Sequence, residues 1–155
     1  MHSRVFQLSD EELPEDEWMS LYHIPEWFYG SVADSAIESE NREADFAWLR
    51  ESMRGAAKLQ GNKLTFEKDA AIKYFAGMHK AFLQKLEEIK SVSLEEFAGI
   101  TGNFGVQLHF LTSLYNDEFE FYIYHNDSLM TMDEWIRYTD LTHPFFVGGI
   151  FDYHY

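Results

Sequence analysis

The stretch from Gly105 to His125 constrains the fold more strongly than any other, because it has the pattern of two β-strands joined at Asn116-Asp117. With these two residues as the loop, Phe110 lies opposite Ile123 on a face that is almost wholly apolar. The other face is mixed and titratable, and it pairs His109 with Tyr124, Leu111 with Tyr122 and Ser113 with Glu120. A slip of one residue would exchange the two faces, so their clean separation supports this register. The sequence therefore predicts a β-hairpin over 105–125 at the centre of a sheet.

A second pattern, between residues 70 and 90, is typical of an amphipathic helix. Its apolar stripe repeats at spacings of three and four residues over about five turns. The residues of this stripe are Ile72, Phe75, His79, Phe82, Leu86 and Ile89. A stripe of this length needs an apolar surface to cover it, so we expect the helix to pack against the sheet.

Shorter patterns predict the remaining elements. These are strands over 3–9 and 63–67, a helix from Asn41 as N-cap through Met53, and short helices at the capping boxes Ser93–Glu96 and Thr131–Glu134. A chain of 155 residues is long enough to bury a substantial core. We therefore expect an α+β fold with a mostly antiparallel sheet, formed by a single compact domain over residues 1–155.

Charge restricts what the protein binds. The formal net charge is −15, with thirteen acids and three bases in residues 1–51, four acids and eight bases in 52–90, and ten acids and one base in 91–155. Such a surface repels phosphates, so we expect no direct binding of nucleic acid and a basic protein as the partner. The alternative is that the acids serve solubility alone, with the basic middle segment facing the acidic ones.

Composition also narrows the chemistry and the compartment. The chain contains no cysteine, which excludes disulfides, thiolate catalysis and zinc–thiolate sites. It has no apolar run long enough for a signal peptide or a membrane span, so we expect a cytoplasmic protein without a membrane partner. No motif for a cofactor is present, and none is expected.

Two groups of side chains are candidates for the contact with a basic partner. The first is the acidic run 10–17, whose carboxylates are Asp10, Glu11, Glu12, Glu15, Asp16 and Glu17. The second is the mixed face of the hairpin, with His109, Glu120, Tyr122 and Tyr124. Tyrosine combines a large contact area with a polar tip, which suits a protein interface. Both groups have alternatives, since acids complement the dipole at the start of a helix and a pocket of His, Glu and Tyr could act as acid and base.

The C-terminal residues suggest a metal site. A second hairpin, about Gly148-Gly149, would place His143 opposite His154, with Asp152 on the same face. Nitrogen and oxygen ligands of this kind suit zinc, iron or nickel. In the alternative interpretation, Gly148-Gly149 marks a β-bulge and the three residues are ordinary side chains of an edge strand.

The charge and the candidate surface together favour a small binding protein. We expect an inhibitor or immunity-type domain that presents an acidic and aromatic surface to a basic protein, in its sharpest form as a mimic of nucleic acid. One alternative is a small metal-dependent or acid–base enzyme that uses the C-terminal histidines or His109. Another is a structural subunit of an assembly, which a large exposed apolar patch would favour.

Overall fold

The computed structural model describes residues 1–155, and these form two compact units. The first unit contains Met1–Tyr74 and Glu118–Tyr155, and the second contains Phe75–Asp117. The second unit is therefore an insertion in the sequence of the first. A single domain over the whole chain stays a prediction, because compactness alone does not decide whether two units fold together.

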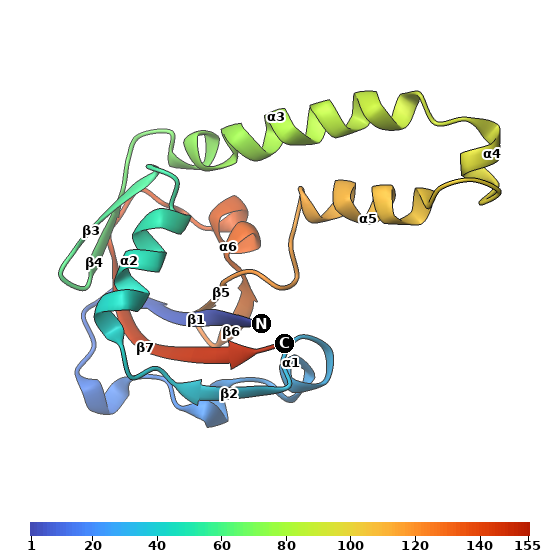
Figure 1. Cartoon of the computed structure of the whole chain (residues 1–155). Coiled ribbons are helices and arrows are strands. Elements are labelled where there is room, and N and C mark those ends of the chain that lie inside the picture. Colours follow the sequence, from blue (N-terminus) through green and yellow to red (C-terminus); the bar gives the residue numbers. More distant parts are fainter. The chain divides into compact units, whose positions relative to one another are not determined.

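A seven-stranded sheet is the frame of the first unit (Figure 1). Its strands are β1 His2–Ser9, β2 Ser35–Glu38, β3 Ala57–Gln60, β4 Lys63–Phe66, β5 Tyr122–His125, β6 Ser128–Thr131 and β7 Phe145–His154. Six of them lie in the order β3-β4-β7-β1-β5-β6, and β2 also pairs with β7. Only β1 and β5 run parallel, whereas every other pair is antiparallel. The predicted α+β fold with a mostly antiparallel sheet is confirmed.

Three of the helices begin where the sequence places their caps. The helices are the 3-10 helices η1 Glu15–Glu17 and η2 Leu21–His23, and the α-helices α1 Glu26–Ser31, α2 Arg42–Ser52, α3 Ala70–Lys90, α4 Leu94–Phe97, α5 Phe104–Ser113 and α6 Met132–Tyr138. Asn41 caps α2 by accepting a hydrogen bond from the backbone N–H of Ala44, at 3.1 Å. The capping boxes that start α4 at Ser93 and α6 at Thr131 are confirmed. No helix combines the length and the hydropathy that a membrane span requires.

Strand β7 has an irregular register with β1. The register shifts between Phe6 and Leu8, where Gly148 and Gly149 together lie opposite the single residue Gln7. Two residues opposite one define a β-bulge. Glycine is required at position 148, because a Cβ atom there would come within 2.3 Å of Gln7 Oε1. The chain therefore does not turn at these glycines, and the predicted C-terminal hairpin is wrong.

Successive residues along β1 point to opposite sides of the sheet. Val5 and Phe6 are neighbours and are both fully buried, so both faces of the sheet are covered at this strand. The face that carries Val5 packs against η2 and α1, and this core consists of Val5, Met19, Ile24, Phe28, Val32, Ala33, Tyr122, Tyr124, Phe151 and Tyr153. On the face that carries Phe6, the rings of Trp135 in α6 and Phe145 pack edge to face, with 4.8 Å between their centroids.

The predicted hairpin over 105–125 is wrong. Its first half forms the helix α5 in the second unit, and its second half contains β5, which belongs to the first unit. The hairpin that β5 does form is with β6, about Asn126 and Asp127. These two residues have φ angles of 49° and 58°, as a tight two-residue turn requires. The sequence contains the dipeptide Asn-Asp twice, and the chain makes a hairpin at the second copy.

A helix cap at Asn103 explains why this segment is helical. Asn103 Oδ1 accepts a hydrogen bond from the backbone N–H of Val106 at 3.3 Å, as Asn41 does for α2. The residues that follow fit both periods, because apolar side chains recur at every second position and also three or four positions apart. The apolar pattern alone therefore does not distinguish a strand from a helix, and the N-cap at Asn103 favours the helix.

The second unit is a helical hairpin without a closed core. After α4 the chain reverses, so that α5 runs in the opposite direction to α3 (Figure 1). The helix predicted over 70–90 is confirmed as α3, but its only buried residues are Ala70 and Tyr74, which belong to the first unit. No residue from Phe75 to Asp117 is buried. Packing of the stripe on the sheet beyond Tyr74 stays a prediction.

Candidate functional site

The acidic run 10–17, which we call the acidic loop, follows β1 and ends with η1. All six of its carboxylate side chains are exposed. Asp10 contacts two histidines, and Glu12 Oε1 accepts a hydrogen bond from Asn62 Nδ2 at 2.7 Å. The other four carboxylates form no ion pair. The loop therefore presents several carboxylates that form no ion pair within the protein.

Two side chains hold the chain beyond the acidic loop in place. Gln7 Oε1 accepts hydrogen bonds from the backbone N–H groups of Met19 and Gly149, both at 2.8 Å. Trp18 Nε1 donates to the carbonyl of Leu13 at 3.2 Å, which closes the loop on itself. Because these bonds fix the backbone at Leu13 and at Met19, the carboxylates between them project from a defined position.

The anchor is completed by Arg42 at the start of α2. Its guanidinium lies over the Trp18 ring, 4.4 Å from the centroid, and donates to the carbonyls of Val147 and Gly148. Burial lowers the pKa of Arg42, and the charges of Asp45 and Glu15 oppose this effect. Arginine remains fully charged under such a shift, so Arg42 ties the end of the loop to the β-bulge.

Asp10 connects the loop to the sheet through two histidines. Its Oδ1 lies 3.0 Å from His143 Nε2 and 3.4 Å from His125 Nε2. An indole N–H can only donate, so the 3.2 Å bond from Trp135 Nε1 makes Nδ1 of His125 the acceptor and leaves the proton on Nε2, which faces Asp10. The hydrogen bond from His143 lowers the pKa of Asp10, burial opposes this, and the electrostatic interaction and the hydrogen bond with His125 add to the lowering.

A second ionic cluster is buried beneath α2. Asp45, which is 1% exposed, accepts a hydrogen bond from Arg4 Nε at 2.6 Å and one from the Ser39 hydroxyl at 2.5 Å. Arg4 also pairs with Asp152 at 3.0 Å and covers the Trp48 ring, 4.6 Å from its centroid. Each charge is compensated within the cluster, which makes this a structural feature of the fold.

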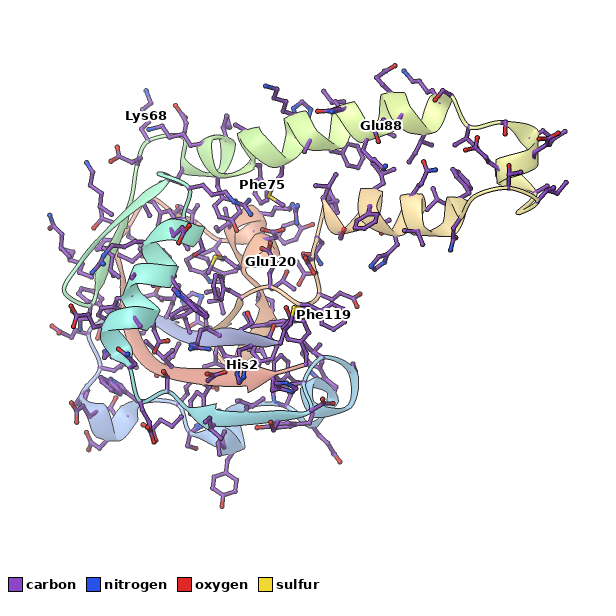
Figure 2. The ribbon with its side chains drawn as sticks, in the orientation of Figure 1. His2, Lys68, Phe75, Glu88, Phe119 and Glu120 are labelled. Atoms are coloured by element: carbon purple, nitrogen blue, oxygen red, sulfur yellow. The ribbon has the colours of Figure 1, made fainter.

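An open pocket of about 370 Å³ lies beside this cluster. Its walls combine aromatic rings with carboxylates, and Phe119 and Glu120 come from the coil that precedes β5 (Figure 2). Arg54 is already present in the pocket, 3.9 Å from Glu120. Aromatic faces together with carboxylates suit a cationic side chain. The residues that line the pocket are Ser3, Trp48, Glu51, Ser52, Arg54, Phe119, Glu120 and Phe121.

The predicted mixed face of the hairpin does not exist as a surface. Tyr122 and Tyr124 are 3% and 8% exposed and belong to the core, where burial raises the pKa of Tyr124. His109 is exposed on α5 in the second unit. Glu120 alone lines a pocket of the first unit. The prediction failed because β5 lies inside the sheet, between β1 and β6, and both of its faces are covered.

The three predicted metal ligands are not brought together. His143 precedes β7 and contacts Asp10, whereas His154 is the last residue of β7 and lies 3.6 Å from Asp34. The carboxylate of Asp152 pairs with Arg4 and with His2, the first residue of β1, which is labelled in Figure 2. No group of three or more metal-binding side chains is present. The predicted metal site is wrong, because β7 is one continuous strand that keeps the two histidines at opposite ends.

The sequence interpretation missed Gln7 and His125. Gln7 is a polar residue between the apolar residues Phe6 and Leu8 of the strand, and the glycine pair at 148–149 was the matching signal that a large side chain lies opposite. His125 gave no such signal, because its contact with Asp10 joins residues 115 positions apart.

Comparison with protein-family models, with curated proteins and with solved structures gave no match to this chain. The class of protein is described by the fold alone: an α+β unit built on a seven-stranded sheet, with a helical insertion.

Proposed function

We propose that the protein is a small protein-binding domain of the inhibitor or immunity type, which holds a basic partner on its acidic loop. The observation that carries this proposal is the set of exposed carboxylates on a backbone that Gln7, Trp18 and Arg42 fix in place. A preformed loop loses little conformational entropy on binding, so its charge interactions contribute directly to affinity. The pocket with Glu51 and Glu120 supports the same proposal, because it suits a lysine or arginine side chain.

The test compares the loop with an equal charge change elsewhere. The loop variant carries Glu15→Gln, Asp16→Asn and Glu17→Gln, and a labelled lysine- and arginine-rich peptide serves as the probe. An exposed ion pair is worth about 0.2–1 kcal/mol, so three lost pairs reduce affinity about 3-fold to about 150-fold. Binding is measured by fluorescence anisotropy at about 50 mM and about 300 mM salt, since screening weakens exposed charge pairs.

The matched control carries Glu87→Gln, Glu88→Gln and Glu95→Gln, three exposed acids of the second unit. It changes the net charge by the same amount and breaks two exposed ion pairs of little energetic value. We expect it to reduce peptide affinity less than about 2-fold. Equal losses in both variants would mean that the peptide responds to net charge alone, and the proposed site would be abandoned.

A further inference from the structure

The second unit exposes far more apolar surface than a free helical hairpin tolerates. Helix α5 reads Phe-Gly-Val-Gln-Leu-His-Phe-Leu-Thr-Ser and contains no acid and no lysine or arginine. Its polar side chains are Gln107, His109, Thr112 and Ser113, and the apolar side chains on the rest of its surface are of a kind that is normally covered. The large aliphatic and phenylalanine side chains that are exposed in this unit are Leu83, Leu94, Phe97, Ile100, Val106, Leu108 and Phe110.

The inner side of the hairpin is also incompletely covered. Phe82, Leu86 and Ile89 of α3 lie on its predicted apolar stripe, yet each is only half-buried. Phe104 and Leu111 of α5 are half-buried as well. Two helices bury one seam between them but cannot enclose a core, which in helical bundles usually takes a larger number of helices.

We propose that this unit binds the same unit of a second copy of the chain, so that two helical hairpins form a four-helix bundle. The proposal goes beyond the binding of a basic partner and uses a different surface. In a two-fold symmetric dimer each copy contributes the same surface patch to the interface. A patch with little charge suits such an interface, because it does not place like charges opposite one another.

The distribution of charge selects a second copy over other occupants. The second unit has five acids and three bases, net −2, whereas the first unit has twenty-two acids and nine bases, net −13. Two of the three bases are already paired, Lys85 with Glu88 at 2.8 Å and Lys90 with Glu87 at 2.5 Å. A basic partner would gain little here, whereas two copies of the chain repel each other least through this unit.

The exposed area is sufficient for a stable dimer. If a whole large side chain contributes about 150–250 Å², the exposed parts of the seven side chains amount to at most roughly 600–1,000 Å². One partner contributes about 800 Å² to an interface of standard size. About half of this area comes from Leu94, Phe97 and Ile100 in α4 and the turn that follows it, so only a contact that uses this end of the hairpin together with α5 and α3 reaches the range in which specific dimers are found.

The test uses the full-length chain and measures its mass by sedimentation velocity between about 1 and 100 μM, a range that covers moderate affinities. We expect a dimer. The variant Val106→Glu with Phe110→Glu changes two exposed residues one turn apart on α5, and it should raise the dimer dissociation constant by about 100-fold or more. The matched control, Tyr22→Glu with Ile37→Glu, adds the same charge at exposed apolar residues of the first unit and should remain dimeric.

A second measurement covers the case in which the α5 variant does not fold. Hydrogen exchange of the unmodified chain should show stronger protection of the α3 and α5 amides at high than at low protein concentration. A monomer over the whole concentration range would overturn the proposal. A dimer that persists in the α5 variant, or a monomer that binds vesicles of neutral phosphatidylcholine through this unit, would overturn it as well.

Discussion

Replacing Gln7 by alanine should destabilise the first unit strongly, because one side-chain oxygen serves two buried backbone donors. Gln7 is 6% exposed, and its Oε1 accepts from Met19 N and from Gly149 N, both at 2.8 Å. Leaving one buried donor unsatisfied costs about 1–3 kcal/mol, so losing both bonds costs about 2–6 kcal/mol. This cost is a large fraction of the free energy of unfolding of a typical protein, which is about 5–15 kcal/mol.

The same contact can be disturbed from β7. In Gly148→Ala the three atoms nearest to the new Cβ would all belong to Gln7, at 2.3, 2.8 and 3.2 Å. The amide must move and give up its hydrogen bonds, so this substitution also costs about 2–6 kcal/mol. Once Gln7 is alanine, the obstacle is gone, and Gly148→Ala should then cost less than about 1 kcal/mol.

Urea unfolding followed by tryptophan fluorescence measures this cycle, because all four tryptophans lie in the first unit. Gly149→Ala is the control, since its Cβ would lie 3.0 Å from the backbone oxygen of Met19 and should stay costly in the Gln7→Ala background. If the costs of Gln7→Ala and Gly148→Ala simply add, the two residues do not share one contact and the reasoning is refuted.

Two further predictions concern a buried carboxylate, Asp45, and an exposed one, Asp10. Asp45→Ala removes the buried partner of Arg4 and should lower the free energy of unfolding, measured in urea, by about 3–5 kcal/mol. Glu88→Ala breaks an exposed ion pair and should lower it by less than about 1 kcal/mol. Similar losses in the two variants would contradict the role assigned to burial. Asp10 has a lowered pKa in the folded state, mainly through His143, so its contribution is present above the unfolded pKa of about 3.9 and is lost as the pH falls through the folded pKa. The stability difference between the unmodified chain and Asp10→Asn should therefore shrink on acidification from about pH 6 to about pH 3, and a difference that does not change over this range would disprove the role of Asp10.

Elements with local determinants could be predicted from the sequence. The cap at Asn41, the capping boxes at Ser93 and Thr131, and the stripe of the long helix each involve residues within one or two turns of one another. Such local signals can be read from the sequence without the tertiary contacts that supply most of the stability of a helix.

The site could be predicted only in part, because burial is a property of the whole sheet. Exposure of the acidic loop follows from its six carboxylates, which are rarely buried without partners. The burial of Tyr122 and Tyr124 depends on β1 and β6 flanking β5, and β1 lies more than 100 residues earlier in the chain. The histidine contacts of Asp10 likewise join distant segments.

The pairing of β7 has a consequence for the order of folding. This strand contacts β1, β2 and β4, and its partner in β1 is separated from it by almost the whole chain, as in the pair His2 and His154. Contacts between such distant residues form late, because the loop that they close is long. During synthesis, β1, β2 and β4 therefore stay unpaired with β7 until this strand has been made, and by then the helical insertion, which lies between β4 and β7 in the sequence, is already synthesised. A newly made chain would pass through a stage in which its sheet is open and prone to aggregation.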